Sequence, residues 1–558
     1  MIEVTDIPAT LAQGLGKHSC LAVGLRDVVG LFKCLPHEIA SIELHRKSID
    51  ARKKDHVHFV LSIRLQLIDS LDEHEIVKRA SASEQRRIRI IENVKPSFPA
   101  PLPCPPTRRP VVVGAGCAGL FCALSLAEAG LEPLLIERGD DATRRTEAID
   151  HFTSTAELDT ESNIQFGLGG AGTFSDGKLT TGTKNPAHRL ILETLVEAGA
   201  PREILWDAKP HVGSDVLPQV VETIAQRIRN LGGEIRHRTR LVDIERSGGT
   251  SGQVTGIVVE TRDPHAGNPG AVQTERIACD RLVLACGHSA RDVFELLRQR
   301  GVLLRRKTFA MGVRIEHLQA DIDRAQYGPA AGHKALGAAP YKLVAHLPNG
   351  RSLFSFCMCP GGQVVAAASE AGGVVTNGAS LYARDGVNAN SALLVNINPD
   401  DLPGKDVLAG VALQRSCEHR AFELGGGAYR APAQLVGDFL ARRPSTGCGS
   451  IEPTYPLGVT WCELDSALPP HVIDTLRAGI PALERRLRGF SNPEAVLTGV
   501  ETRSSSPVTV VRGRDCQAEG TPGLYPCGEG AGYAGGIMSA ATDGIRCAEA
   551  VVASLRDA

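Results

Sequence analysis

A glycine-rich motif carries the clearest chemical signal in the chain. The apolar segment Pro110–Val113 leads into Gly114-Ala-Gly116-Cys-Ala-Gly119, and the acidic Glu137 follows about 20 residues later. Gly114 permits a tight turn, Gly116 lets backbone N–H groups approach a pyrophosphate, and Gly119 lets the next helix lie close to the sheet. The positive end of that helix faces the phosphates, and Glu137 can accept hydrogen bonds from a ribose diol. A glycine turn without a ligand is the alternative, but the full spacing predicts a dinucleotide site.

Two later motifs indicate that the dinucleotide is FAD. Leu282-Val-Leu-Ala285-Cys-Gly287 resembles a strand end of glutathione-reductase-like flavoproteins, with cysteine in place of threonine. Tyr525-Pro-Cys-Gly528-Glu529-Gly530 resembles the motif whose acid binds the ribityl hydroxyls, with glutamate in place of aspartate. A final helix from about Ile537 can point its N-terminus at the N1–C2=O edge of the flavin. Each motif alone could be an ordinary turn, but three in this order favour FAD.

The segment Gly167–Lys178 is the most unusual of the chain. By analogy with related flavoproteins, we expect this glycine-rich loop to pass beneath the pyrophosphate and the flavin, since glycines permit close backbone approach. Lys178 could stabilise negative charge on the flavin or bind an acidic substrate, whereas the alternative is an Asp176–Lys178 pair on a loop surface. The residues predicted to bind FAD are Gly114, Gly116, Cys117, Ala118, Gly119, Glu137, Arg138, Gly170, Thr173, Ser175, Asp176, Val242, Ala285, Cys286, Gly287, Gly528, Glu529, Gly536 and Ile537.

Three residues are predicted to take part in catalysis: Lys178, His288 and Arg314. His288 follows a strand end at the nucleotide crevice, where ligands bind in open α/β sheets, so it is a candidate acid–base group; capping of the turn is its alternative role. Arg314 can clamp a carboxylate or phosphate with its planar fork, or pair structurally with Glu316 on the same strand face. Arg503 could reach the substrate or bridge the domains.

Two cysteines, Cys357 and Cys359, flank Met358. Residues two apart on an extended segment point the same way, so both sulfurs could face the flavin. A dithiol that passes electrons to FAD is the alternative role, but the spacing differs from that of flavin-linked disulfides. Two thiols are also too few for a closed zinc site, so we expect a packing role and no metal site. A second glycine motif after a strand is absent, so either a nicotinamide, NAD(P)H, binds transiently over the flavin or the reductant is another molecule.

The elements around these motifs divide the chain. The pattern of residues 1–96 predicts a small α+β domain. We expect a helix over Leu25–Leu35, a strand at Ile42–His45 and a strand over Val57–Leu67 in which apolar and polar residues alternate. A proline-rich linker covers 97–107. The first part of the FAD-binding domain is expected over 108–300, an inserted substrate domain over 301–494 and the C-terminal part of the FAD-binding domain over 495–558. Within the nucleotide domain we expect a helix over Val220–Leu231 and strands over Glu234–Glu245, Val254–Thr261, Gln273–Ile277 and Arg281–Gly287.

Length and composition are those of a large enzyme. The chain has 558 residues and a formal net charge of −2, which argues against a general nucleic-acid or membrane surface. No run of 18 apolar residues exists, the N-terminus lacks the pattern of a signal peptide, and fifteen cysteines show no disulfide framework. We therefore expect a cytoplasmic protein that binds a small-molecule substrate and neither nucleic acid nor membrane; the sequence leaves its oligomeric state open.

The whole chain resembles the bacterial FAD-dependent dehydrogenases often labelled NAD(FAD)-utilising. The segments that carry the resemblance are Ser48–Lys54, Asn163–Lys178, Gly287–Asp292, Gly312–His317, Cys357–Gly362 and Cys527–Ser539. It implies an α/β fold: a Rossmann-type FAD-binding domain with antiparallel strand insertions, an inserted α+β substrate domain and a small N-terminal α+β domain. The leading functional hypothesis is an FAD-dependent dehydrogenase or reductase that passes a hydride through flavin N5. A flavoprotein of tRNA modification and an FAD-based redox sensor are the alternatives.

Overall fold

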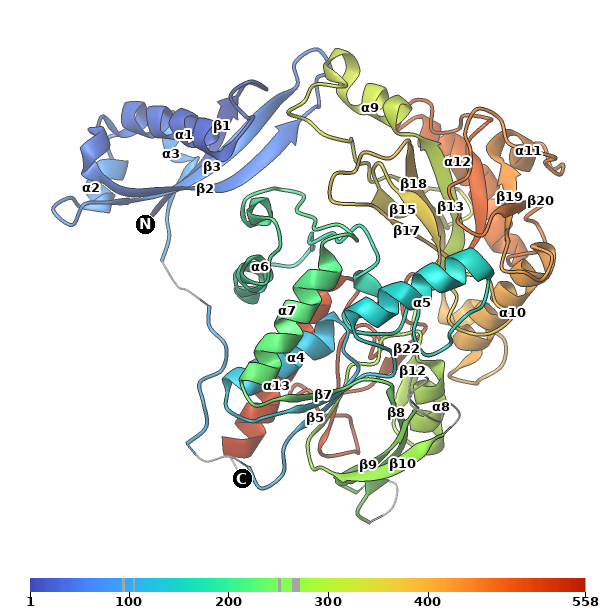
Figure 1. Ribbon diagram of the computed structural model, residues 1–558. Coiled ribbons are helices and arrows are strands. Elements are labelled where there is room, and N and C mark those ends of the chain that lie inside the picture. The colour runs from blue at the N-terminus through green and yellow to red at the C-terminus, as the bar shows by residue number, and fades with distance from the viewer. Residues whose placement is uncertain (93–95, 104–105, 249–251, 263–270, 557–558) are drawn as a thin grey trace.

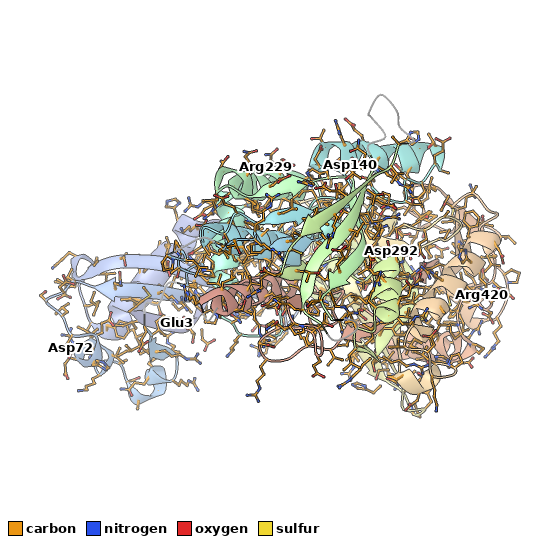
Figure 2. The ribbon with its side chains drawn as sticks, turned by 90° about the horizontal axis from the view of Figure 1, so that it is seen from below. Glu3, Asp72, Asp140, Arg229, Asp292 and Arg420 are labelled. Atoms are coloured by element: carbon orange, nitrogen blue, oxygen red, sulfur yellow. The ribbon has the colours of Figure 1, made fainter. Side chains whose placement is uncertain are left out.

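The computed structural model describes residues 1–92, 96–103, 106–248, 252–262 and 271–556. A nucleotide-binding region lies between a small N-terminal region and a larger inserted region (Figure 1). Figure 2 shows the same order from another side: Glu3 and Asp72 mark the N-terminal region at one end, and Arg420 marks the inserted region at the other. Within the described ranges, no helix combines the length and apolarity needed to cross a bilayer.

A parallel sheet of five strands forms the centre of the nucleotide-binding region. Its order is β23-β11-β5-β6-β7, and every neighbouring pair runs parallel. Four of these strands are short runs of fully buried residues, as expected of a parallel sheet that is covered on both faces. The strands span Leu524–Pro526 (β23), Leu282–Leu284 (β11), Val111–Val113 (β5), Leu134–Ile136 (β6) and Glu234–Arg236 (β7).

Different layers cover the two faces of this sheet. Val112 points toward three helices, whereas Val111 and Val113 point the other way, because successive strand residues alternate between faces. The helices are α4 (Cys117–Glu128), α7 (Leu217–Asn230) and α13 (Ile537–Arg556). The opposite layer is an antiparallel sheet of β8 (Thr239–Arg246), β9 (Val254–Thr261) and β10 (Gln273–Ala278). This architecture confirms the predicted Rossmann-type domain with its antiparallel insertion.

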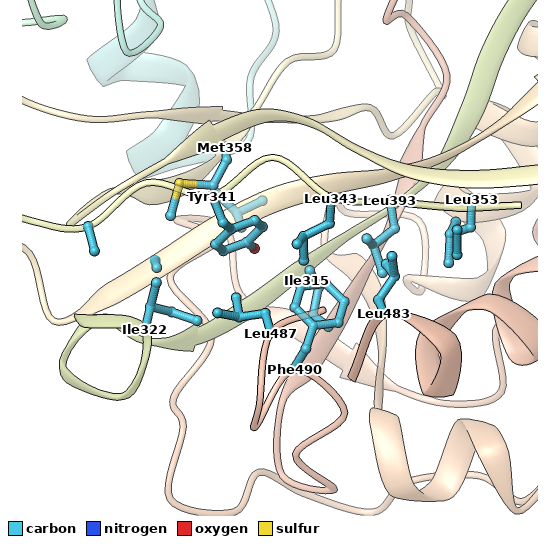
Figure 3. Close-up of a cluster of buried hydrophobic side chains, with 14 of the residues drawn as sticks. Ile315, Ile322, Tyr341, Leu343, Leu353, Met358, Leu393, Leu483, Leu487 and Phe490 are labelled. Carbon is cyan, nitrogen blue, oxygen red and sulfur yellow. The ribbon is translucent and has the colours of Figure 1, made fainter. Parts of the chain in front are cut away.

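The inserted region is built on a seven-stranded sheet. Its order is β14-β15-β18-β13-β21-β19-β20, with only the β19–β20 pair parallel. Ile315, Leu353 and Leu393 come from neighbouring strands and pack against Leu483 and Phe490 (Figure 3). The strands span Phe309–Leu318 (β13), Val344–His346 (β14), Ser352–Cys359 (β15), Asn388–Ile397 (β18), Ala431–Leu435 (β19), Val459–Trp461 (β20) and Val496–Glu501 (β21).

Further elements surround the two large sheets. The helices are α5 (Ala142–Thr155), α6 (Ala187–Glu197), α8 (Arg291–Gln299), α9 (Gln319–Tyr327), α10 (Ala409–Leu424), α11 (Val436–Leu440) and α12 (Pro470–Glu484). Two small strand pairs are β12 (Leu304–Arg306) with β22 (Val508–Val510), and β16 (Gln363–Ala366) with β17 (Thr376–Ala379).

The N-terminal region is a four-stranded sheet, in the order β2-β3-β1-β4, with one long helix packed on it. Gly24 of that helix lies so close to the sheet that a Cβ there would be 2.5 Å from Ile63. Strand β2 also bonds to the main body, because Lys47 N donates to Trp206 O at 2.7 Å. The elements are β1 (Ile2–Ala9), α1 (Lys17–Phe32), β2 (Ile39–Asp50), β3 (His58–Leu67), α2 (Glu73–Val77), α3 (Ala82–Gln85) and β4 (Ile88–Ile90).

Several element boundaries differ from the sequence predictions. The first helix starts eight residues before the expected Leu25, because Gly16 is its N-cap and the polar Lys17-His-Ser turn is helical. The strand predicted over Glu234–Glu245 is two strands, since Arg238 adopts a left-handed φ of 50° where the chain leaves the parallel sheet. The sheet of the inserted region takes in β21, so it extends past residue 494.

Candidate active site

A cavity of about 740 Å³ lies where the carboxyl ends of the parallel strands meet the inserted region. This is the place where ligands bind in open α/β sheets, and the volume is typical of a cofactor site. Its wall has two parts. We call the first the nucleotide wall, made of the glycine turn and its neighbours, and the second the insert wall, made of the 175–182 and 208–210 segments with residues of the inserted region. The insert wall includes Lys178, Lys209, Tyr341, Lys342, Cys357 and Arg384.

Glycines shape the nucleotide wall by close backbone contacts. Gly114 has a φ of +96°, and a Cβ there would lie 2.5 Å from Ala285 O. A Cβ on Gly119 would lie 1.8 Å from Gly114 O, so neither position accepts a side chain without movement of the backbone. Helix α4 begins at Cys117 with Gly116 as its N-cap, and both residues line the cavity. A helix N-terminus of this kind can accommodate a pyrophosphate, the ligand that the sequence analysis expects here.

Glu137 is the acid of the nucleotide motif, and it is 5% exposed at the end of β6. Its carboxylate accepts backbone N–H bonds from Ala115 at 2.7 Å and from Gly139 and Gly167 at 2.9 Å each. The side chain thus joins the glycine turn to the loop predicted to pass beneath the pyrophosphate. It also lines the cavity, where its carboxylate can accept hydrogen bonds from ribose hydroxyls.

The loop after α5 is held against the glycine turn by Arg145, a residue that the sequence analysis missed. Gly169 N donates to Ala115 O at 2.8 Å, which brings the two glycine segments together. The guanidinium of Arg145 is fully buried and donates to five carbonyls of this loop, those of Asn163, Ile164, Gly167, Leu168 and Gly170. The signal in the sequence was an arginine on the apolar face of an amphipathic helix, between Ala142 and Phe152.

His288 and Glu529 meet in the cavity near the C-terminal motif. His288 Nε2 donates to Arg503 O at 2.9 Å, and its Nδ1 lies 3.5 Å from Glu529 Oε1. Burial lowers the pKa of His288 to about 4 and raises the pKa of Glu529 to about 7. Since the imidazole is neutral at neutral pH, the contact is not an ion pair, and Glu529 can hold or release a proton there.

Lys178 and Asp176 form the ion pair that the sequence offered as an alternative, but the pair is not on a surface. Lys178 Nζ lies 2.9 Å from Asp176 Oδ2, and the two side chains are 29% and 0% exposed. Asp176 also accepts from Arg384 Nε at 2.9 Å and from Ser380 Oγ at 2.8 Å. Lys178 Nζ is buried and, apart from this ion pair, has no hydrogen-bond partner among the described residues, so its remaining N–H groups are available to a ligand in the cavity.

Arg314 lies behind the insert wall. It is fully buried, and its Nε donates to Glu501 Oε2 at 2.6 Å, so its acidic partner is Glu501 and not Glu316. Glu316 accepts instead from Thr454 Oγ1 at 2.6 Å. This burial contradicts the expectation that Arg314 binds a substrate anion, because its guanidinium group already donates its hydrogen bonds to protein groups.

The other predicted site residues divide between the cavity wall and the layer behind it. Val242 is the unpaired residue where the β8–β9 register shifts between Leu241 and Asp243, and the residues that line the cavity there are Thr239, Arg240 and Leu241. The predicted residues on the wall are Gly114, Gly116, Cys117, Ala118, Glu137, Arg138, Gly170, Ser175, Lys178, Ala285, Cys286, Gly287, His288, Glu529, Gly536 and Ile537. Gly119, Thr173, Asp176 and Gly528 support that wall from behind.

Arg503 bridges the regions and also reaches the cavity. Its guanidinium donates to the buried Glu418 at 2.8 Å, and Arg291 donates to the same carboxylate at 2.7 Å. Burial raises the pKa of Glu418, but the two guanidinium groups outweigh it and hold that pKa well below its usual range. Since Arg291 belongs to α8 and Glu418 to α10, this buried cluster fixes the inserted region against the nucleotide domain.

One group of side chains has the ligand types of a metal site. Cys527, Asp543 and Cys547 bring their ligand atoms within 4.8 Å of one another. However, Arg512 donates to Asp543 Oδ2 at 3.0 Å and to Cys547 Sγ at 3.3 Å, so a cation already occupies the centre of the group. Asp543 also accepts the Gly528 N–H at 2.7 Å, which positions the C-terminal FAD motif.

The chain is similar to several known flavoproteins and to one curated bacterial protein. Residues 308–504 match the family described as "FAD-dependent protein, C-terminal domain-like", and residues 112–169 match the NAD(P)-binding Rossmann-like domain. A protein of Clostridium beijerinckii, described as uncharacterized, is 43% identical over 522 residues, or 92% of this chain and 93% of that protein.

Two solved structures also resemble the chain over most of its length. The flavin-dependent brominase Bmp2 is 13% identical over 80% of this chain and 79% of its own, with a TM-score of 0.35. A geranylgeranyl bacteriochlorophyll reductase-like protein from Thermoplasma acidophilum is 11% identical over 81% of this chain and 80% of its own, with a TM-score of 0.34.

Proposed function

The chain belongs to a family of FAD-dependent flavoproteins, and from this premise we propose that it is a dehydrogenase or reductase acting on a small anionic molecule. When bound, FAD supplies the group that accepts or donates a hydride at N5. The glycine turn fits this cofactor, because its positions 114 and 119 leave no room for side chains and the start of α4 faces the cavity. Glu137 and Glu529 supply carboxylates toward the ribose and ribityl hydroxyls.

The charge of the insert wall supports the anionic substrate. Lys178, Lys209, Lys342 and Arg384 line this side of the cavity, and Asp176 neutralises only part of their charge. A cavity lined by one sign of charge raises the local concentration of ligands of the opposite sign. The proposal that the substrate is an anion rests on this group of cationic side chains beside the nucleotide wall.

Proton handling falls to Glu529 and His288. The raised pKa of Glu529, about 7, lets its carboxyl exchange a proton near neutral pH. Nδ1 of the neutral His288 lies 3.5 Å away, where it can accept a hydrogen bond from the protonated carboxyl and orient it. The substrate then lies between this pair and the lysine-rich wall. NADH or NADPH is proposed as a transient reductant that enters the same cavity.

The test begins with the cofactor. We expect heat to release FAD at about one molecule per chain, identified by chromatography; a colourless protein that cannot be reconstituted would contradict the proposal. Anaerobic rapid mixing of the FAD-loaded protein with NADH, NADPH and pairs of candidate substrates then measures flavin reduction. Each pair consists of a carboxylate or phosphate and its neutral ester. Faster reduction or reoxidation by the anions supports the substrate class, and a preference for the neutral esters rejects it.

A further inference from the structure

The insert wall contains a cysteine in an unusual backbone position. The β15–β18 register shifts between Phe356 and Cys359, so two residues of β15 bulge out of the ladder. Cys357 has a left-handed φ of 42°, which is uncommon for a residue other than glycine. Bulges next to functional sites often redirect a side chain. Here Met358 packs in the hydrophobic core beside Tyr341 (Figure 3) and also reaches the cavity wall, and its neighbour Cys357 lines the cavity as well. The packing role expected from the sequence therefore does not describe Cys357.

The guanidinium behind the wall holds this bulge in place. Both terminal nitrogens of Arg314 donate to Cys357 O, at 3.4 and 3.3 Å, and Nη1 also donates to Asn390 Oδ1 at 2.5 Å. The same Nη1 lies 3.9 Å from Cys359 Sγ. Because Arg314 is fully buried and paired with Glu501, it fixes the bulge and adds positive charge behind the two sulfurs. It is a positioning residue for Cys357.

The surroundings of Cys357 favour its thiolate. Cys359 Sγ donates to the backbone carbonyl of Cys357 at 3.2 Å, which keeps the two cysteines side by side. The Cys359 side chain lowers the pKa of Cys357, burial opposes this, and the charges of Lys178 and Arg314 add to the lowering. The Cys357 side chain, together with burial, raises the pKa of Cys359, which therefore stays a thiol. Negative groups also act on this site and limit the effect. The charged and titratable groups around Cys357 are Lys178, Arg314, Cys359, Asp176, Glu501 and Glu529.

We propose that Cys357 is a nucleophilic thiolate of the cavity wall that forms a covalent bond with an electrophilic carbon of a small anionic ligand. The sulfur contributes the electron pair of the new S–C bond, and the leaving group departs with the pair of the bond that breaks. No electron acceptor is needed, and Cys359 keeps its proton. The cations Lys178, Lys209, Lys342 and Arg384 select the anion. This covalent site adds to the proposed function and does not depend on hydride transfer.

Alkylation of the FAD-loaded protein tests the proposal, with iodoacetate as the anionic probe and iodoacetamide as its neutral counterpart. Iodoacetate forms the S–C bond and releases iodide. Mass spectrometry of peptides follows Cys357 and, in the same sample, Cys448, which is exposed and serves as the internal reference. At pH 6 we expect Cys357 to react about tenfold faster than Cys448, since thiolate fraction outweighs the lower nucleophilicity of a low-pKa thiolate.

The pH profile and the charge preference give two further readouts. The rate at Cys357 should be nearly constant from pH 6 to 8, whereas the rate of free cysteine, measured separately with the same reagent, rises by about tenfold per pH unit. Iodoacetate should be favoured over iodoacetamide at Cys357 by about tenfold relative to Cys448, because the insert wall attracts anions. Cys357→Ser should remove the label from this peptide only.

Two lysine variants distinguish the effect of a nearby charge on Cys357 from a general effect of lysine substitution on the fold. Lys178→Met should move the alkylation midpoint of Cys357 up by about one pH unit or more, as expected for loss of a nearby opposite charge. Lys405→Met, at an exposed position of the inserted region, is the matched control and should change nothing. The proposal is overturned if the parent protein is labelled at Cys448 before Cys357, or if the Cys357 rate rises with pH as steeply as that of free cysteine.

Discussion

The nucleotide wall and the insert wall of the cavity are built in different ways. The nucleotide wall presents backbone groups, and its key side chain, Glu137, is used to hold three N–H groups of the turn and the loop. The insert wall presents charged side chains and a cysteine, from segments as distant as Lys178 and Arg384. Backbone groups suit a cofactor that every turnover needs in one place, whereas side chains suit a substrate whose charge must be recognised. We therefore assign cofactor binding to the first wall and recognition of the substrate's charge to the second.

Substitution of glycines in the nucleotide wall should have the largest effect on FAD binding and on stability. Gly119→Ala places a Cβ 1.8 Å from Gly114 O, so we expect loss of FAD and a fall of about 1–3 kcal/mol or more in the free energy of unfolding. Gly116→Ala meets only Gly170 Cα at 3.7 Å, so this variant should fold normally and lose FAD affinity alone.

FAD content and urea unfolding, measured on both variants, distinguish these outcomes. Gly30→Ala, in α1 with nothing within 4 Å of the added Cβ, is the control that should retain FAD. Full FAD occupancy in both Gly116→Ala and Gly119→Ala would show that the turn does not hold the cofactor.

Arg145 should be the most important side chain behind the nucleotide wall. Arg145→Met leaves five loop carbonyls without their donor, and each unsatisfied buried group costs about 1–3 kcal/mol, so the loop should loosen and FAD should be lost. Arg145→Lys should rescue little, because a single ammonium cannot reach carbonyls that a planar guanidinium spans. Hydrogen exchange of residues 163–170 measures the loosening. Unchanged protection in Arg145→Met would contradict this role.

These residues show what the sequence could and could not predict. The glycine spacing, Glu137 and the start of the last helix at Ile537 were predictable, because they depend on local backbone requirements that appear as fixed intervals. The partner of Arg314 was not, since Glu501 reaches it only through the pairing of β13 with β21. The exposure of Cys357 to the cavity depends on a bulge, and nothing in the alternation of β15 indicates where the ladder breaks.

Removal of the Glu137 carboxylate from the nucleotide wall should have an intermediate effect on the affinity for FAD. Glu137→Ala should weaken FAD binding by about 1–3 kcal/mol, since hydrogen bonds to a charged acceptor are lost on both the turn and the ribose. Glu137→Gln keeps the shape of the side chain and should lose less FAD affinity than Glu137→Ala. Titration of the apoprotein with FAD measures both affinities, and equal affinity of Glu137→Ala and the parent would refute the placement.

Glu529 should make the stability of the protein depend measurably on pH. Its pKa is raised from 4.5 to about 7, so its contribution to stability is full below pH 4.5 and is lost as the pH rises to about 7. Allowing for its partial exposure, we expect about 2 kcal/mol. His288 has the opposite sign, because its lowered pKa reduces stability as the pH falls from 6.5 to about 4.

Urea unfolding at pH 5 and pH 7.5 distinguishes the contribution of Glu529 to stability from that of His288. The parent protein should lose more free energy of unfolding between these values than Glu529→Gln, which cannot ionise. An equal change in both proteins would show that this carboxyl does not titrate in the window.

Lys178 tests the division between the two walls most directly. Its ammonium is buried in the insert wall with hydrogen-bonding capacity to spare, and it should stabilise the reduced, anionic flavin more than the oxidised one. We predict that Lys178→Met keeps full FAD occupancy and lowers the two-electron flavin potential by about 30 mV, equivalent to about 1.4 kcal/mol. Potentiometric titration beside the parent protein, at equal FAD content, measures this shift. An unchanged potential would contradict the placement of Lys178 beside the flavin, and loss of FAD from the variant would contradict the assignment of cofactor binding to the nucleotide wall.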